Sequence, residues 1–287
     1  MEKSLLVGDF LLGLKFIYGA PVLPFVYQKL PGFTDPKSGD VIIFKYPGTD
    51  KKDYIKRCVA GPGQSITING KTVLLDGKEY KLPPQGQYIH DGMLDPRITN
   101  LGSLYVPKRG DSYKIDTLNT RDFLFVKHIV RQELPRAKVS AKVQLYLDGE
   151  FANTQRAVTY GYQEVSFNDI NFDQIDLWTI LDDIFTHVKG KYAGRKVDIR
   201  TLLYVNDKQV LTYTCKNDNY FMMGDNRDNS TDSRYWGFLN RNFVKAQAFI
   251  LYFSLDKDVP LWQLPLKIRW NRIGKIIRPW DGGITTP

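Results

Sequence analysis

The stretch Ser65-Ile-Thr-Ile-Asn-Gly-Lys-Thr-Val-Leu-Leu75 predicts a β-hairpin. Strand-forming residues flank Asn69-Gly70, and Asn-Gly is the usual type I′ turn because both of its central residues need positive φ. Asp76-Gly77 predicts a second turn of this kind. Upstream, Asp40–Phe44 and Tyr54–Val59 are short apolar or alternating runs that end close to Pro and Gly, as strands do. This part of the chain is therefore expected to form an antiparallel sheet.

The same pattern continues downstream, so the predicted fold class is mainly β. Ala141–Leu147 alternates and stops at Asp148-Gly149, 203–211 forms another hairpin around Asn206-Asp207, and 246–255 is a late strand. One helix is predicted over 173–187, where Ile175, Trp178, Leu181 and Phe185 recur at helical spacing before a stop at Gly190. We expect two core segments, 1–77 and 216–258, interrupted by an inserted domain at 78–215 that contains this helix and followed by a basic, tryptophan-containing tail at 259–287.

Composition excludes several protein classes. The chain has 287 residues, of which 43% are hydrophobic and 25% charged, which excludes a disordered tail and a polytopic membrane protein. Two cysteines, Cys58 and Cys215, are too few for a disulfide scaffold, and three scattered histidines do not suggest a metal site. The most apolar stretch, 5–23, is interrupted by Asp9 and Lys15, so neither a membrane span nor a signal peptide is expected.

The charge balance favours an anionic partner. The net charge of +9 suits a nucleic acid, an anionic membrane surface or an acidic ligand. The basic residues are dispersed, however, and no RNA-recognition, KH, zinc-finger or P-loop signature is present. We therefore expect no nucleic-acid partner.

Two segments contain more polar residues than a purely structural role would require. The first is Asp53-Tyr-Ile-Lys-Arg-Cys-Val-Ala-Gly-Pro-Gly63. The second runs from Met223 to Gly237, and nine of its first twelve residues are Asn, Asp, Ser or Arg. Polar groups packed so densely between hydrophobic runs must satisfy one another if they are buried. These two segments are the candidate functional site.

At these segments the chain resembles bacterial signal peptidase I, a serine–lysine protease family. The resemblance rests on Tyr54-Ile-Lys-Arg57 and on Gly224-Asp-Asn-Arg-Asp-Asn-Ser-Thr-Asp-Ser-Arg234, and extends to 38–47 and to 5–12. It implies an antiparallel β-sheet catalytic core of the signal peptidase type, and no metal or organic cofactor. It also implies that Lys56 is the general base, that Ser230 hydrogen-bonds and orients Lys56, and that two ion pairs, Arg57 with Asp225 and Arg234 with Asp232, support the site.

The resemblance also implies where the nucleophile belongs. The family's serine lies in a Ser-x-Ser-Met segment, and Met1-Glu-Lys-Ser-Leu5 matches it from the methionine onward. The catalytic serine would then be the residue immediately before Met1, and the membrane anchor would lie further upstream. Ser4 aligns with a later Thr/Ser position that is not the nucleophile. The chain as written is therefore expected to lack its nucleophile and not to cleave peptides.

The chemistry requires Lys56 to lose its proton. A serine hydroxyl needs an adjacent base, and a lysine is a base only when neutral, whereas its ordinary pKa is about 10.4. A lysine base that works near neutrality needs a pKa roughly two to three pH units lower. This change corresponds to a destabilisation of the charged form by about 3–4 kcal/mol, which burial against apolar surface can provide. Strand alternation places Tyr54, Lys56 and Cys58 on one face and Arg57 on the other. Lys56 can therefore face an apolar environment while Arg57 meets carboxylates elsewhere.

The resemblance further implies a substrate and a location. Signal peptides end in small residues at the first and third positions before the cut, and shallow apolar pockets select them sterically. The first pocket would be lined by Met1, Leu5 and Tyr54, and the third by Leu11, Ile43, Asp53 and Ile55. The peptide is expected to bind in an extended form at the edge of the sheet. The protein would act on exported preproteins at the outer face of the bacterial cytoplasmic membrane.

The tail supports a membrane partner, and two alternatives remain. Trp262, Trp270 and Trp280 are interleaved with Lys and Arg, a composition suited to the headgroup zone of an anionic bilayer. One alternative is a non-catalytic relative that binds signal peptides or a secretion partner. The other is a self-cleaving repressor, which also uses a Ser–Lys pair but would need a DNA-binding helix-turn-helix and an internal scissile bond, neither of which the sequence contains.

Overall fold

The chain folds into two compact units. The computed structural model describes residues 4–19, 31–48, 52–88, 96–152, 157–160, 163–170, 172 and 177–284. Unit 1 consists of Met1–Pro107, Asp218–Arg234 and Leu239–Pro287, and unit 2 of Lys108–Asn217 and Tyr235–Phe238. All pairings between named strands are antiparallel. The mainly antiparallel β fold class predicted from the sequence is thus confirmed.

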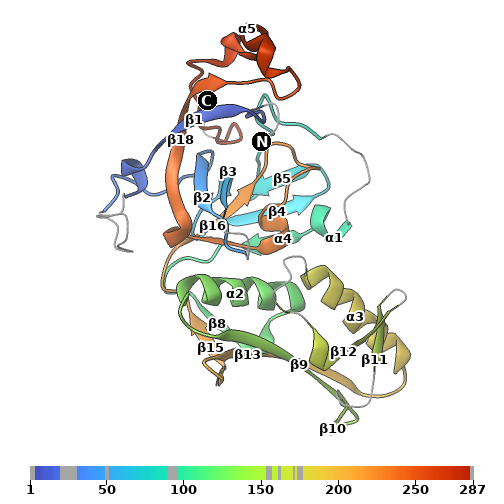
Figure 1. The fold of residues 1–287 in the computed structure, drawn as a ribbon. Helices are drawn as coiled ribbons and strands as arrows, with labels where there is room; N and C mark the ends of the chain where they lie inside the picture. The colour runs from blue at the N-terminus through green and yellow to red at the C-terminus, as the bar shows by residue number, and fades with distance from the viewer. Residues whose placement is uncertain are drawn as a thin grey trace. The chain divides into compact units, whose positions relative to one another are not determined.

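Unit 1 is built around a six-stranded sheet with the order β1-β18-β2-β3-β16-β17 (Figure 1). Its strands are β1 (Asp9–Leu14), β2 (Val41–Lys45), β3 (Asp53–Ala60), β16 (Asn219–Met223), β17 (Leu239–Asn240) and β18 (Val244–Ser254). Every residue of β16 is buried, as are the last four residues of β3. The sheet brings the two polar segments of the sequence together, since β3 carries the first and pairs with β16, which leads into the second.

A second sheet in unit 1 contains the hairpin that the sequence predicts. Its order is β6-β5-β4-β7, with β4 (Ser65–Asn69), β5 (Thr72–Leu75), β6 (Lys78–Glu79) and β7 (Gly102–Tyr105). Asp76 and Gly77 both have positive φ, as a type I′ turn requires. The turn predicted at Asn69-Gly70 differs, because Asn69 pairs with Thr72 as the last residue of β4 and only Gly70 has positive φ.

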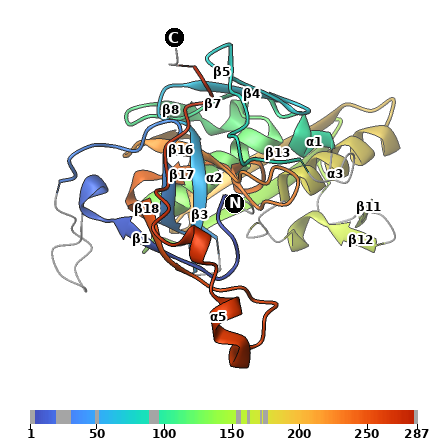
Figure 2. The ribbon, with the colours of Figure 1, turned by 90° about the horizontal axis from the view of Figure 1, so that it is seen from above.

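After β18 the chain forms a small lobe and then returns to unit 1. We call residues 255–273 the C-terminal lobe; it contains the short helix α5 (Leu264–Lys267). In Figures 1 and 2, α5 lies beyond the β1–β18 edge of the sheet. Further on, the indole of Trp280 donates to the carbonyl of Lys81 (3.0 Å), and its main-chain amide donates to Gly39 (3.0 Å). Trp280 is therefore tied to the body of unit 1, whereas Trp262 and Trp270 are exposed.

Unit 2 combines small sheets with two helices. Its four-stranded sheet has the order β10-β9-β13-β14. Its strands are β8 (Ser112–Lys114), β9 (Val139–Leu147), β10 (Glu150–Phe151), β11 (Ala157–Tyr160), β12 (Gln163–Ser166), β13 (Val197–Val205), β14 (Lys208–Val210) and β15 (Thr212–Thr214). The turns at Asp148-Gly149 and Asn206-Asp207 both have two residues with positive φ, which confirms the two predicted turns.

The described residues of unit 2 contain two long helices, one more than the sequence analysis identified. The predicted helix is α3 (Leu177–Lys191), which continues through Gly190; positions 173–176 lie outside the described residues. The sequence analysis missed α2 (Thr120–Glu133), in which every residue from Phe123 to Val130 is buried. Its apolar residues follow a helical period as clear as that of α3, so the signal was present in the sequence and was overlooked. Its start is marked by Asn119, whose side chain accepts a hydrogen bond from the Asp122 amide.

The boundary of the inserted region also differs from the predicted one. Unit 2 begins at Lys108, not at residue 78, because β7 pairs with β4 and so keeps the preceding residues in unit 1. The other short helices are α1 (Pro96–Thr99) and α4 (Ser233–Trp236). In the part of the chain that the structure describes, no helix is long and apolar enough to cross a membrane.

Candidate active site

Lys56 lies in the middle of β3, directly opposite Ile42 of β2. Its Nζ atom is 5.8 Å from the centroid of the Tyr54 ring, two residues earlier on the same face of the strand. Tyr54 in turn stacks on Tyr46, with ring centroids 4.4 Å apart. Ile42 and Cys58 are fully buried. Lys56 is thus held among apolar and aromatic groups, as the alternation of the strand predicts.

The surroundings of Lys56 favour its neutral form. Burial lowers the pKa of the Lys56 ammonium below its ordinary value, and the positive charge of Arg234 acts in the same direction. The carboxylates of Asp232 and Asp225 oppose this change in pKa without reversing it. Within the described residues, Lys56 Nζ has no ion pair or hydrogen bond that would hold its proton. An amine in such a setting is closer to acting as a base than an exposed lysine is.

The hydroxyl of Ser230 is a second polar group of the candidate site, and the described residues do not use its hydrogen-bonding capacity. Its Oγ is buried and has no hydrogen-bond partner in the described part of the chain, so the bond to Lys56 that the resemblance implies is not formed here. Ser230 packs tightly against Gly224, because a Cβ added to that glycine would lie 2.3 Å from Ser230 Oγ and 2.7 Å from its Cβ. The position before Asp225 therefore accommodates no side chain while Ser230 stays in place.

Arg57 and Asp225 form a buried, two-pronged ion pair. Arg57 Nε and Nη2 each donate to one oxygen of the Asp225 carboxylate, both at 2.9 Å, and Nη1 donates to the carbonyl of Gly39 at 2.7 Å. Burial alone would raise the pKa of Asp225, but Arg57, through its hydrogen bonds and charge, outweighs it and holds this pKa below its ordinary value. The pair therefore clamps β3 to the loop that follows β16.

Asp232 and Arg234 form the second buried pair. Arg234 Nε and Nη2 donate to the two oxygens of Asp232 at 2.8 and 2.9 Å. Asp232 also accepts a hydrogen bond from the Gly224 amide at 3.1 Å, and Arg234 donates to the carbonyl of Arg227. These contacts tie the two ends of the polar loop together. The loop is thus a folded, internally bonded structure and not an open surface segment.

The residues that the resemblance assigns to the two substrate pockets lie in different parts of unit 1. Leu5 belongs to an apolar cluster with Val41, Ala248 and Leu251. Leu11, Ile43 and Ile55 pack against that cluster and are only partly buried. Leu5 therefore lies with three residues assigned to the third pocket, and Tyr54, one residue from Ile55 along β3, packs on Tyr46. Asp53 is paired with Lys245 at the exposed end of β3, and Met1 lies outside the described residues.

One residue of the site received no role in the sequence analysis. Ser4 Oγ donates to Asp225 at 2.6 Å, and so joins the chain's first residues to the Arg57–Asp225 pair. The resemblance aligned Ser4 with a Thr/Ser position, which was the available signal. Its partner is 221 positions away, however, and a contact of that range cannot be inferred from local pattern.

Neither metal chemistry nor a disulfide is evident among these groups. No three His, Cys, Asp or Glu side chains of the described residues gather closely enough to hold a metal ion. Cys58 and Cys215 are both free and buried. Burial raises the pKa of both thiols, that of Cys215 to about 12, so both are protonated at neutral pH. We therefore assign neither cysteine a chemical role.

Comparison with known proteins places the chain in a family. Residues 1–253 match the family described as "Signal peptidase, peptidase S26". The chain belongs to this signal peptidase family. Signal peptidase I from Buchnera aphidicola of the pea aphid is 28% identical over 278 residues, which cover 96% of this chain and 72% of the relative. Signal peptidase I from Pseudomonas aeruginosa is 28% identical over 288 residues, or 96% of this chain and 68% of the relative.

A further curated relative agrees with the family assignment, and one solved structure is similar to part of the chain. Signal peptidase I from Aquifex aeolicus is 26% identical over 264 residues, covering 88% of this chain and 72% of the relative. A solved signal peptidase I from Enterococcus faecalis covers 75% of this chain and 97% of its own, with 14% identity and a TM-score of 0.26. Membership of the signal peptidase family supports a hydrolase of the peptidase class that processes signal peptides.

Proposed function

We propose that this signal peptidase works as a serine endopeptidase in which Lys56 is the general base. The observation that carries the proposal is the setting of Lys56, which is half-buried beside Tyr54, has a lowered pKa and has no ion pair among the described residues. A neutral amine can accept the proton of a serine hydroxyl as that hydroxyl attacks a peptide carbonyl. The serine implied by the resemblance aligns immediately before Met1.

Ser230 is proposed to orient Lys56. Its buried Oγ has no partner within the described residues, so its capacity to donate and accept a hydrogen bond is unused. The two ion pairs hold the loop that carries Ser230 against β3, where Lys56 lies. In this arrangement Arg57, Asp225, Asp232 and Arg234 act as structural support and do not touch the substrate.

The proposed substrates are signal peptides of exported preproteins with small residues at the first and third positions before the cut. The partly buried Leu11, Ile43 and Ile55 are proposed to line the third pocket, together with Asp53, and Met1, Leu5 and Tyr54 the first. A shallow apolar surface accepts alanine and excludes larger side chains by steric clash. The peptide would bind extended, as an added strand.

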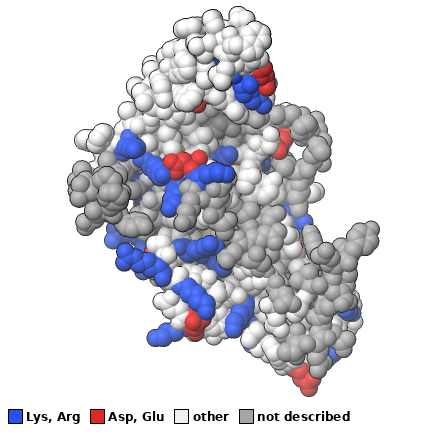
Figure 3. Space-filling view, in the orientation of Figure 1, with Lys and Arg blue, Asp and Glu red and all other residues white. Residues whose placement is uncertain are grey.

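The protein is proposed to work at a membrane surface, on the outer face of the bacterial cytoplasmic membrane. The C-terminal lobe exposes Leu261, Trp262, Leu266 and Trp270, each more than 60% accessible to solvent. Phe10 and Leu12 on the neighbouring strand β1 are exposed as well. On the face seen in Figure 3 the region around α5, at the top, is mostly uncharged. Exposed tryptophan and leucine on an uncharged surface are suited to the interfacial zone of a bilayer.

The test is cleavage by the chain extended at its amino end through the family's Ser-x-Ser segment. The extended chain is expected to cut a peptide with an Ala-x-Ala site, and changing the added catalytic serine to alanine should abolish the cut. Lys56→Ala should lower kcat by about 10²–10⁴-fold at neutral pH while the protein stays folded. Retained cleavage in Lys56→Ala would remove this lysine from the mechanism.

The pH profile gives an independent check. Because only the neutral amine is a base and its pKa is lowered by burial, kcat/KM should rise with pH and level off below the ordinary lysine value of 10.5. A rising limb centred at the ordinary value would contradict the proposed base. An extended chain that binds the peptide without cutting it would favour the non-catalytic relative.

A further inference from the structure

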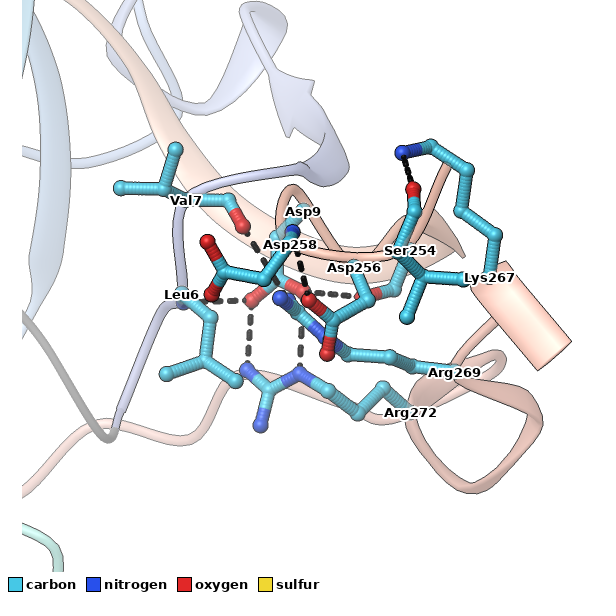
Figure 4. Close-up of polar contacts among 10 residues, drawn as sticks. Leu6, Val7, Asp9, Ser254, Asp256, Asp258, Lys267, Arg269 and Arg272 are labelled. Atoms are coloured by element: carbon cyan, nitrogen blue, oxygen red, sulfur yellow. Dashed lines mark hydrogen bonds and ion pairs between the residues drawn. The ribbon is translucent and has the colours of Figure 1, made fainter. Parts of the chain in front are cut away.

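The base of the C-terminal lobe is a cluster of charged residues, shown in Figure 4. The Asp256 amide donates to the carbonyl of Lys267 (2.7 Å), and the Arg269 amide donates to that of Ser254 (3.0 Å). Arg269 also pairs with Asp256, and Lys267 donates to the carbonyl of Val259. The two ends of the lobe are thus fastened to each other at its base, while Leu261, Trp262 and Leu266 between them are exposed.

From this base, two arginines reach the first residues of the chain. Arg272 Nε and Nη2 donate to the two oxygens of the Asp9 carboxylate at 2.9 and 2.5 Å. Arg272 also donates to the carbonyl of Ser4 (3.2 Å), and Arg269 to that of Val7 (3.1 Å). Two main-chain carbonyls of residues 4–9, which we call the leading segment, are therefore held by side chains of the lobe.

Asp9 is the centre of this arrangement. Its side chain is only 2% exposed, and it also accepts hydrogen bonds from Ser254 Oγ and from the Leu6 amide, both at 2.7 Å. Burial by itself would raise the pKa of Asp9, but the hydrogen bonds from Arg272, Ser254 and Leu6 hold it below its ordinary value. The carboxylate is therefore charged at neutral pH and joins strand β18, the lobe and the leading segment at one point.

Ser4 links this cluster to the candidate active site. Its carbonyl accepts from Arg272, and its hydroxyl donates to Asp225, the partner of Arg57 on β3. The leading segment is thus held between two carboxylate–arginine pairs, Asp9 with Arg272 and Asp225 with Arg57. In the proposed function the nucleophile lies four residues before Ser4, so the leading segment anchors the stretch of chain that carries the attacking oxygen.

We propose that Arg272 is a positioning residue that couples the C-terminal lobe to the nucleophile through the leading segment. The inference rests on the proposed function for its catalytic consequence, but the coupling itself is a property of the chain as it stands. An arginine serves here because its planar fork can bind a carboxylate with two donors while one nitrogen also reaches a carbonyl. A lysine could balance the charge of Asp9, but it could not hold the Asp9 carboxylate and the Ser4 carbonyl together in a fixed geometry.

The first test uses the full chain of 287 residues and amide hydrogen exchange. In Arg272→Met, the amides of Leu6 and Asp9 should exchange at least about 10-fold faster, because their bonds depend on the geometry of Asp9 and the leading segment. The amide of Cys58, which donates to Asp40, should keep its protection. Arg278→Met, which removes an exposed arginine further along the chain, is the matched control and should change neither.

Two results would overturn the coupling. One is unchanged exchange at Leu6 and Asp9 in Arg272→Met. The other is an equal loss of protection at Cys58, which would mean that Arg272 only stabilises the fold. Arg272→Lys separates charge from geometry, and should leave the Leu6 amide less protected than in the unaltered chain.

The second test measures turnover in the chain extended through its nucleophilic serine. Arg272→Met should lower kcat by about 10- to 100-fold, as expected for a misplacement of the attacking group, while KM changes less than threefold. A rise in KM with unchanged kcat would contradict the positioning role. If the extended, otherwise unaltered chain does not cut, the proposed function fails, and the hydrogen-exchange result still decides whether the coupling exists.

Discussion

Charged residues are used differently in the two units. In unit 1, the pairs Arg57–Asp225 and Arg234–Asp232 have side chains that are at most 6% exposed. In unit 2, the ion pairs recorded among the described residues are exposed, as in Lys114–Asp116, Lys138–Asp207, Arg195–Asp148 and Arg200–Asp198, or partly exposed, as in Arg121–Asp122. Unit 1 also has the largely buried pair Arg272–Asp9, beside exposed pairs such as Lys245–Asp53. Since desolvation offsets most of the attraction in a buried pair, stability alone does not explain why unit 1 buries ion pairs.

This difference shows in which part of the protein the orientation of charged side chains is fixed. A buried pair adds little net stability over a hydrophobic replacement, but it fixes the direction of the groups that it joins. In unit 1 the first two pairs hold the loop after β16, one against β3 and the other within the loop itself. Surface pairs such as those of unit 2 fix little, because water and salt screen them. The candidate site therefore lies in the part of unit 1 where buried ion pairs hold the charged side chains in place.

The largest expected effect comes from breaking one buried pair. Arg57→Met leaves the Asp225 carboxylate buried without its cation, and should lower the free energy of unfolding by about 3–5 kcal/mol in urea denaturation. Lys138→Met, which breaks an exposed pair of unit 2, is the matched control and should leave the urea midpoint unchanged. The double variant Arg57→Met with Asp225→Leu should recover much of the loss. Equal effects of the two single variants would remove the contrast between the units.

A smaller effect is expected from filling the space at Gly224. In Gly224→Ala the new methyl group would meet Ser230 Oγ and Cβ, and relief of this clash should cost about 1–3 kcal/mol of unfolding free energy. Ser230→Gly in the same chain should restore most of it, because both contacting atoms are then absent. Thermal unfolding of the single and double variants measures this coupling. A Gly224→Ala protein as stable as the parent would mean that the loop is not tightly packed.

The smallest effect, with the opposite sign, is expected at Gly190 in unit 2. This glycine is exposed near the end of α3, and a Cβ there would have no atom within 4 Å. Gly190→Ala should therefore stabilise the protein by about 0.5–1 kcal/mol, since alanine loses less backbone entropy in a helix. The urea midpoint measures the gain. A loss of stability would show that the end of α3 needs glycine for another reason.

The strands were easier to predict from the sequence than the helices. Short runs bounded by Gly, Pro, Asn and Asp marked most of the strands, because turn residues act locally. At Asn69-Gly70 the same reasoning misplaced the turn by one residue, since the pairing of Asn69 with Thr72 depends on both strands. The helix α2 was missed although its apolar residues have a helical period as clear as that of α3, and although Asn119 marks its start with a side-chain cap.

The sequence by itself determined the mainly β class, most of the turns and the two polar segments, since these follow from alternation, local conformational preference and unusual composition. Only the tertiary structure decided which charged groups meet. Arg57 and Asp225 are 168 positions apart, and Asp9 and Arg272 are 263 positions apart. Contacts over such separations depend on how the sheet orders its strands, and that order is set by packing of the whole core and not by any one segment.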